Sequence, residues 1–192
     1  MSPRRPTLNR AVSLAHVLAG ERLSPGDTAV DATAGNGHDT AFLAARTTPG
    51  GRVVAIDVQE EALASASSRT AGWDHVEYHH ACHGTIAAIL GESRARVVMF
   101  NLGYLPRGNK GITTRPATTR TALDGSLTIL EPGGLITVVV YPGHDGGHEE
   151  RACVEDWARS LDQDRFSAIH YRFLNQRNDP PELVAVEKRE EN

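Results

Sequence analysis

A short glycine-rich turn, DATAGNGHDT (31–40), has the residue types that suit a nucleotide-like ligand. Gly35 and Gly37 lack side chains, so a ligand can approach the backbone closely, and the following helix would point its N-terminus at that ligand. Asp57 comes 20 residues after Gly37, at the end of the next apolar segment. An acidic residue in that place commonly accepts hydrogen bonds from the two ribose hydroxyls of an adenosine. The spacing therefore predicts either NAD or S-adenosylmethionine as the ligand.

Charge distinguishes these two ligands. NAD would bring a pyrophosphate to the turn, where Asp31 and Asp39 would repel it. S-adenosylmethionine carries a sulfonium, an ammonium and one carboxylate, so its net charge is positive and its ammonium needs oxygen acceptors. Thr40 also stands where a dinucleotide-binding loop has its third glycine. We therefore predict S-adenosylmethionine as the cofactor; an NAD-dependent oxidoreductase is the alternative, and Asp39 could instead only cap a helix.

A second cluster, HHACHG (79–84), places three histidines and a cysteine near the end of a strand. Alternate residues of a strand face opposite ways, so these side chains would not converge on an ion, and we predict no metal site. Cys82 and His83 are better suited to the rim beside an adenine ring. Gln59 would contact the adenine or the ribose, or would equally be the solvated start of a helix. The predicted cofactor-binding residues are Asp31, Ala34, Gly35, Asn36, Gly37, Asp39, Asp57, Gln59, Cys82 and His83.

The segment MFNLGYLPRGNKGITTRP (99–116) is where we expect the acceptor. Methyltransferases that act on amino groups often carry Asn/Asp-Pro-Pro-Tyr here, with oxygens that accept hydrogen bonds from the amine and a ring that stacks on the target. This chain has Asn-Leu-Gly-Tyr instead, which could otherwise be a strand end with a packed tyrosine. A histidine in the loop YPGHDGG could orient the acceptor, could help to remove a proton, or could have no such role. The predicted catalytic residues are Asn101, Tyr104 and His144.

Basic and amide side chains near the same edge suit a nucleic-acid partner. The net charge of the chain is −4, so such a partner requires a local basic patch. The loop that begins after Asn101 supplies basic residues, although side chains of this kind are often only solvated. The last loop, NQRNDPPE (175–182), either forms a rigid turn or presents amides to a base or sugar. The predicted substrate-binding residues are Arg107, Lys110, Thr113, Arg115, Tyr141, Asn175 and Asn178.

Seven apolar or β-branched segments would position these residues, at 27–32, 51–58, 75–80, 96–103, 135–141, 166–174 and 182–188. Helical patterns separate all but the last two, which indicates a parallel sheet with helices on both faces and a closing antiparallel hairpin. Seven strands with only the last reversed is the arrangement of class I S-adenosylmethionine-dependent methyltransferases, a Rossmann-like α/β sandwich. A helix that ends at Gly20 would form an N-terminal extension over 1–20, and 189–192 would be a frayed tail.

The bulk composition bounds the class of protein. The chain of 192 residues has the length of one domain, so we expect 1–192 to form a single methyltransferase domain. Two cysteines make no disulfide framework, which fits a reducing compartment. No signal-peptide core follows the basic N-terminus, and the longest apolar run, 135–141, is too short to span a bilayer. We therefore expect a cytoplasmic protein with no membrane association.

With these segments in order, the chain resembles the tRNA 5-(aminomethyl)-2-thiouridine methyltransferase family, of the MnmM type. The segments that carry the resemblance are DATAGNGHDT, AIDVQ, NLGYLP with GNKGITT, EPGGLI, YPGHDGG and LNQRNDPP. The resemblance implies methyl transfer from S-adenosylmethionine to the primary amine of 5-aminomethyl-2-thiouridine at the tRNA wobble position. It also implies the anticodon stem-loop of tRNA as partner and a homodimer. The residues that would hold the cofactor are Asn36, Asp57, Gln59, Cys82 and His83.

Two other functions stay open at the level of the sequence. One is a methyltransferase with the same donor site that acts on another RNA site, such as one in rRNA, or on a small amine. The other is a non-catalytic RNA-binding module. That module would require a degenerate donor pocket, whereas Asp31, Gly35, Gly37 and Asp57 are all present.

Overall fold

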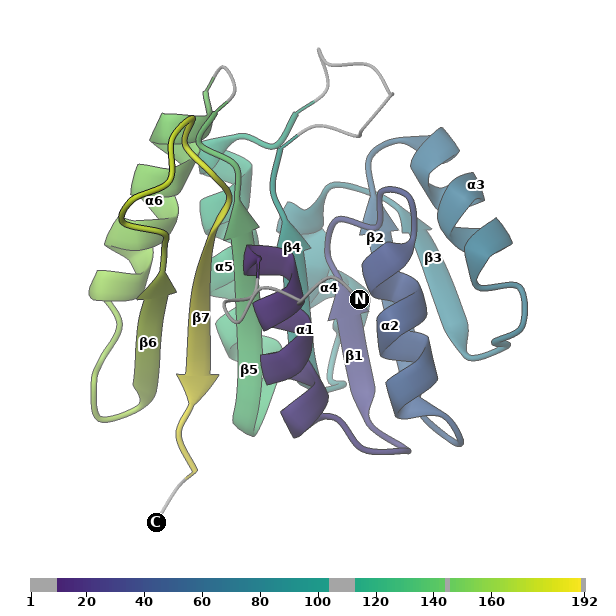
Figure 1. Cartoon of the computed structure of the whole chain (residues 1–192). Coiled ribbons are helices and arrows are strands. Elements are labelled where there is room, and N and C mark those ends of the chain that lie inside the picture. The colour runs from purple at the N-terminus through teal and green to yellow at the C-terminus, as the bar shows by residue number, and fades with distance from the viewer. Residues whose placement is uncertain (1–9, 104–112, 144–145, 191–192) are drawn as a thin grey trace, which may run out of the picture.

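A computed structural model describes residues 10–103, 113–143 and 146–190 of the chain (Figure 1). Strands and helices alternate along these residues as the apolar segments predict. The elements are α1 (Ala11–Arg22), β1 (Thr28–Asp31), α2 (His38–Thr47), β2 (Arg52–Asp57), α3 (Glu60–Arg69), β3 (Val76–His80), the 3₁₀ turn η1 (His83–Thr85), α4 (Ile86–Leu90), β4 (Ala95–Asn101), α5 (Pro116–Ile129), β5 (Leu130–Val140), α6 (Gly147–Arg159), β6 (Phe166–Tyr171) and β7 (Glu182–Lys188).

The strands form one sheet in the order β3-β2-β1-β4-β5-β7-β6. The first five pair in parallel, whereas β7 runs antiparallel to both of its neighbours, β5 and β6. This order and the reversed last strand confirm the predicted class I methyltransferase fold. In Figure 1 the carboxyl ends of the parallel strands point to the top. Ligands of open parallel sheets bind outside that edge, where the strand order reverses, which here is between β1 and β4.

Helices cover both faces of the sheet (Figure 1). α1, α2 and α3 lie on one face, and α4, α5 and α6 lie on the other. Successive strand residues point to opposite faces, so Val53 joins the apolar cluster of α1 and α2, whereas Val54 joins that of α4, α5 and α6. The two apolar layers hold the sheet from both sides and thereby fix the positions at which its strands end.

The N-terminal helix differs from the predicted extension. α1 continues to Arg22, so Gly20 lies inside the helix rather than just past its end. The Leu23 N–H donates to the Ala19 carbonyl at 3.1 Å and closes the helix without a glycine. Buried alanines of α1 pack against β4, β5 and β7. α1 is therefore a part of the sandwich itself.

β5 also begins earlier than the predicted strand at 135–141. It starts at Leu130, and its register with β4 shifts between Ala95 and Val97. The extra residues form a bulge that includes Gly133, which has a φ of 72°. α5 ends at Ile129, and the strand begins at the next residue, before the glycines.

The C-terminal end stays attached to the sheet beyond β7. The Arg189 N–H donates to the Arg165 carbonyl at 2.8 Å. Its Nε also donates to the Ser167 hydroxyl at 3.2 Å. The frayed tail was predicted to begin at Arg189. Instead, Arg189 still forms hydrogen bonds with residues at the start of β6. Residues 191–192 lie outside the described part of the chain.

Candidate active site

Two glycines shape the turn between β1 and α2. Gly35 and Gly37 have positive φ angles of 50° and 76°, which favour glycine. A Cβ on Gly37 would stand 2.5 Å from the Ala66 Cα, so the turn packs against the backbone of α3. Arg69 Nε donates to the Asn36 carbonyl at 2.7 Å and ties the turn to the end of the same helix. Gly37 therefore serves the packing of α3, whereas Gly35 lines a cavity at the carboxyl edge.

Asp57 is held in place by the backbone around it. Its Oδ2 accepts a hydrogen bond from the Gly35 N–H at 2.9 Å, and its Oδ1 accepts one from the Gln59 N–H at 2.9 Å. A carboxylate oxygen can accept a second hydrogen bond, and Asp57 lies in the wall of the cavity. The carboxylate thus keeps acceptor capacity for two neighbouring hydroxyls. Gln59 lines the same wall and is largely buried.

Asp31 lies beneath the turn and is fully buried. Its Oδ2 accepts from the Thr40 hydroxyl at 2.6 Å, and its Oδ1 accepts from the Thr33 N–H at 3.2 Å. Burial and then the negative charge of Asp39 raise the pKa of the Asp31 carboxyl to about 7. The predicted cofactor contact is therefore replaced by a structural role. Asp31 anchors the first turn of α2 through Thr40, the residue that stands in the place of a third glycine.

The opposite end of the cavity is built around Asn101, at the end of β4. Its Nδ2 donates to Asp39 Oδ2, and its Oδ1 accepts from the Tyr141 hydroxyl at 3.2 Å. Its backbone N–H donates to the Thr33 hydroxyl at 2.7 Å. Burial and then the charge of Asp39 raise the pKa of Tyr141, which keeps the phenol protonated as a donor. The structure thus brings together three of the predicted residues, Asp39, Asn101 and Tyr141, in the cavity wall.

His16 of α1 completes this cluster and was not predicted from the sequence. Its Nε2 lies 2.6 Å from Asp39 Oδ1. Its ring stacks on Phe42 of α2, with 4.2 Å between ring centroids and 4° between ring planes. Nothing in the local sequence marks this residue, because it is one polar position within the apolar pattern of a helix. Only the side-by-side packing of α1 and α2 brings it to Asp39.

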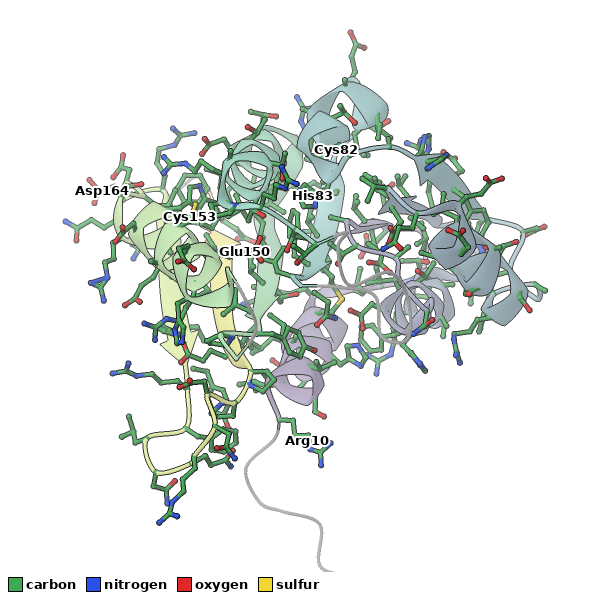
Figure 2. The ribbon with its side chains drawn as sticks, turned by 90° about the horizontal axis from the view of Figure 1, so that it is seen from above. Arg10, Cys82, His83, Glu150, Cys153 and Asp164 are labelled. Atoms are coloured by element: carbon green, nitrogen blue, oxygen red, sulfur yellow. The ribbon has the colours of Figure 1, made fainter. Side chains whose placement is uncertain are left out.

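Cys82 and His83 lie beyond the end of β3, where the sequence places the adenine rim. Figure 2, which looks from above onto the carboxyl edge, labels both. The Cys82 Sγ accepts from the Gly84 N–H at 3.4 Å. The His83 ring packs edge-on against Phe100 and is nearly buried, and its Nε2 has no hydrogen-bond partner among the described residues. Burial lowers the pKa of His83 to about 4, so its imidazole is neutral at neutral pH.

Glu150 of α6, also labelled in Figure 2, contacts the described residues just before α5. Its two oxygens accept from the hydroxyls of Thr114 and Thr119 at 2.6 and 2.7 Å, and only 2% of the residue is exposed. The Thr114 Oγ1 in turn accepts from the Gly103 N–H at 2.8 Å. Gly103 and Thr114 are therefore pinned beside the cavity.

These walls enclose a cavity of about 770 Å³. Thr113 also lines it, and the Thr113 hydroxyl is buried without a partner among the described residues. One end of the cavity lies at the glycine turn and at the ends of β2 and β3, and the other at the ends of β4 and β5. The predicted residues that line it are Ala34, Gly35, Asn36, Asp39, Asp57, Gln59, Cys82, His83, Asn101, Thr113 and Tyr141.

Other predicted residues lie away from this cavity. Arg115 precedes α5 on the surface, and Asn175 and Asn178 are exposed in the loop between β6 and β7. The neighbour of Asn178, Asp179, does line the cavity and was not predicted. The predicted residues that lie outside the described part of the chain are Tyr104, Arg107, Lys110 and His144.

Two further findings concern metals and membranes. Among the described residues, no three His, Cys, Asp or Glu side chains gather as they would around a metal ion. No helix within residues 10–103, 113–143 and 146–190 is long and apolar enough to cross a membrane.

The family model described as "Putative rRNA methylase" matches residues 53–187. The chain belongs to this family. Two solved structures described as rRNA methylases, from Clostridium thermocellum and Streptococcus thermophilus, are similar to this chain. The first has a TM-score of 0.92 and 39% identity to this chain, and the match covers 95% of this chain and 100% of that one. A methyltransferase from Streptococcus mutans in complex with S-adenosylhomocysteine has a TM-score of 0.86 and 36% identity, with 95% and 99% covered.

A curated relative is also an RNA methyltransferase. The chloroplastic tRNA (mnm5s2U34)-methyltransferase of Arabidopsis thaliana is 40% identical over 193 residues, which cover 94% of this chain and 70% of the relative. The family model begins at Val53, after the glycine turn, whereas this relative aligns with nearly the whole chain. Family membership and the class I fold together make the protein a methyltransferase.

Proposed function

We propose that the protein transfers a methyl group from S-adenosylmethionine to 5-aminomethyl-2-thiouridine at the tRNA wobble position, giving 5-methylaminomethyl-2-thiouridine. The observation that carries the proposal is a single cavity with two chemically different ends. At one end, the Asp57 carboxylate can accept hydrogen bonds from hydroxyl groups. At the other, Asp39 and Asn101 have oxygens that can accept hydrogen bonds from an amine. Two relatives support the same reaction. The Arabidopsis relative is named for the methylated wobble nucleoside, and the Streptococcus mutans structure holds S-adenosylhomocysteine.

The donor end fits an adenosine. Asp57 already accepts one backbone N–H on each oxygen and retains a lone pair on each for the two ribose hydroxyls. His83 Nε2 is a buried polar atom that has no partner within the described part of the chain, and an adenine edge would supply one. Because the imidazole is neutral, it can form that hydrogen bond without placing a charge beside the base. When bound, the cofactor supplies an electrophilic methyl group on its sulfonium.

The acceptor end fits an alkylamine that arrives as a cation. Such an amine is largely protonated at neutral pH, and the Asp39 carboxylate in the cavity wall attracts it. The amine must lose a proton before attack, and burial in the cavity lowers its pKa. Asn101 Oδ1 then accepts a hydrogen bond from the neutral amine and orients its lone pair. The chain thus supplies binding and orientation, with no covalent enzyme intermediate.

Several finer features belong to the same proposal. We infer that Tyr104 stacks on the target base and that His144 helps to orient the acceptor. The tRNA anticodon stem-loop would lie over the carboxyl edge, against the predicted contacts Arg107, Lys110, Arg115, Asn175 and Asn178. Residues 1–192 would act as one domain and assemble as a homodimer, which sedimentation equilibrium can test. The free thiols Cys82 and Cys153 suit a reducing compartment such as the cytoplasm.

The deciding experiment is methylation of tRNA that lacks only the final wobble methyl group, read by nucleoside mass spectrometry. We expect 5-methylaminomethyl-2-thiouridine to appear with the wild-type protein and to be lost in Asp57→Ala. Glu61→Gln removes a nearby exposed carboxylate and serves as the matched control. If S-adenosylhomocysteine binds tightly but no methylated nucleoside forms, the wobble uridine is not the substrate.

A further inference from the structure

We propose that His16 is a positioning residue for methyl transfer, acting through Asp39 on the side-chain amide of Asn101. The inference rests on the proposed function and deepens it. His16 Nε2 lies 2.6 Å from Asp39 Oδ1, and Asp39 Oδ2 accepts from Asn101 Nδ2. The Tyr141 hydroxyl donates to the other end of the same amide at 3.2 Å. One chain of hydrogen bonds therefore runs from α1 through α2 to the ends of β4 and β5.

The orientation of the Asn101 amide decides what the acceptor amine meets. An amide presents an acceptor at one end and donors at the other, so a half-turn would replace the Asn101 oxygen with an NH₂ group. That group cannot accept a hydrogen bond from an amine. A carboxylate can only accept, so Asp39 pairs with Nδ2 and selects this orientation, and the Tyr141 hydroxyl then donates to Oδ1. This orientation leaves oxygen as the only side-chain atom of Asn101 that can hold the amine.

Asp39 in turn depends on His16. Its side chain is only 6% exposed, so few water molecules can replace a lost protein partner. With His16 present, Oδ1 is engaged by the imidazole and Oδ2 faces Asn101. Without it, the carboxylate can rotate, or share its oxygens between Asn101 and the cavity. The imidazole therefore fixes the orientation in which the Asp39 carboxylate faces the Asn101 NH₂ group.

His16 is itself held by α2 rather than by the apolar core. Its ring lies parallel to that of Phe42 at 4.2 Å, and Arg46 lies over the same phenylalanine ring at 4.9 Å. The His16 side chain is 28% exposed, whereas α1 packs on the sheet through its alanines. Figure 1 shows α1 and α2 side by side on one face of the sheet. Replacing the histidine should therefore leave the fold intact.

The cavity is lined by Val12, one turn before His16 on α1, and by Asp39. Since His16 contacts the carboxylate from outside this lining, it touches neither the cofactor nor the amine. Its loss should thus affect the rate of the chemical step more than the binding of either substrate. A purely structural role would not produce that separation.

Two substitutions separate the hydrogen bond from the ring stack. His16→Phe keeps an aromatic ring against Phe42 but removes the donor to Asp39. His16→Gln removes the ring but keeps an N–H that can reach Asp39 Oδ1. We expect His16→Phe to lower kcat about 10- to 100-fold, the effect of one charge-assisted hydrogen bond, and His16→Gln to stay within about 5-fold of wild type. KM for tRNA and Kd for S-adenosylhomocysteine should change by less than about 3-fold in both.

Controls make the outcomes unambiguous. Val17→Ala, at an exposed position on the same helix, should leave kcat unchanged. The proposal is overturned if His16→Phe retains wild-type kcat, if both variants lose it equally, or if the loss appears in KM or in cofactor affinity. NMR signals of the Asn101 side-chain NH₂ provide a readout that needs no methylation. They should move in His16→Phe and not in His16→Gln. Unchanged signals in His16→Phe overturn the proposal, whereas a wild-type protein that fails to methylate tRNA overturns the proposed function instead.

Discussion

Replacing Asp57 with asparagine tests the donor site in a way that alanine cannot. Asparagine has the shape of aspartate, but one of its two terminal atoms becomes an NH₂ group. Both oxygens of Asp57 accept backbone hydrogen bonds at 2.9 Å, from Gly35 and from Gln59. In either orientation, the NH₂ group of the new amide therefore faces a backbone N–H group, that of Gly35 or that of Gln59. The same end of the amide also loses an acceptor for a ribose hydroxyl.

The size of the effect follows from these contacts. Loss of one charge-assisted hydrogen bond to ribose costs about 1.5–3 kcal/mol, and a buried N–H left without an acceptor costs about 1–3 kcal/mol. Part of the second cost falls on the free protein, so we expect a loss of about 3–4 kcal/mol in binding. This raises the Kd for S-adenosylhomocysteine about 10²- to 10³-fold.

Isothermal titration with S-adenosylhomocysteine measures this Kd directly. Asp57→Asn should bind about as weakly as Asp57→Ala, although its side chain has nearly the shape of the native one. Glu61→Gln makes the same change of charge at an exposed position of α3 and should bind like wild type. An Asp57→Asn protein that binds within about 3-fold of wild type would refute the assignment of Asp57 to ribose.

Three further substitutions test other parts of the site. Gly37→Ala should lower the free energy of unfolding in urea by about 2–4 kcal/mol, since its Cβ would stand 2.5 Å from the Ala66 Cα at a φ of 76°. The pKa of Asp31 is about 7 in the fold against 3.8 ordinarily, so the unfolded chain releases this proton first. The contribution of Asp31 to stability is thus fully present below about pH 4 and falls by up to about 1.4 kcal/mol per pH unit towards pH 7, and Asp31→Asn should remove this part of the pH dependence in thermal melts. Glu150→Ala leaves Thr114 without its acceptor and should lower kcat, while the Kd for S-adenosylhomocysteine stays within about 3-fold of wild type. Unchanged unfolding, an unchanged pH slope or a normal kcat would contradict the respective argument.

The fold could be predicted because its determinants are local. Each strand of the parallel part is a short apolar segment between helical patterns, and the lack of a helical pattern between β6 and β7 predicts the reversed last strand. The errors arose where local signals have two meanings. Gly20 was taken as a helix stop, but it lies in the interior of α1. The strand was predicted to begin only at 135, because Pro132 and the glycines after it are unusual in a strand, although they form a bulge inside β5.

The donor end was equally accessible from the sequence, whereas the contacts of Asp39 at the acceptor end were not. Gly35 lies in the turn after β1 and Asp57 ends β2, so their proximity follows from the parallel pairing of these two strands. Burial is not written in the local pattern, which is why Asp31 was taken for a ligand contact. The partners of Asp39 are farther away still. His16 precedes it by 23 residues and Asn101 follows it by 62, and only the packing of α1 on α2 and β4 joins them.

The two carboxylates of the turn, Asp31 and Asp39, do not contribute equally to the charge of the cavity. The sequence counts Asp31 and Asp39 as two charges that repel a pyrophosphate. In the structure, Asp31 is buried outside the cavity lining, and its pKa is raised to about 7, so at neutral pH it carries only part of a negative charge. Asp39 therefore carries most of the effect, at the end where a sulfonium methyl group and an amine would meet. A sulfonium and an ammonium would repel each other there, and one carboxylate can offset only one of them. The amine must consequently be neutral when the cofactor is in place, and a fixed Asn101 oxygen is the kind of acceptor that a neutral amine needs.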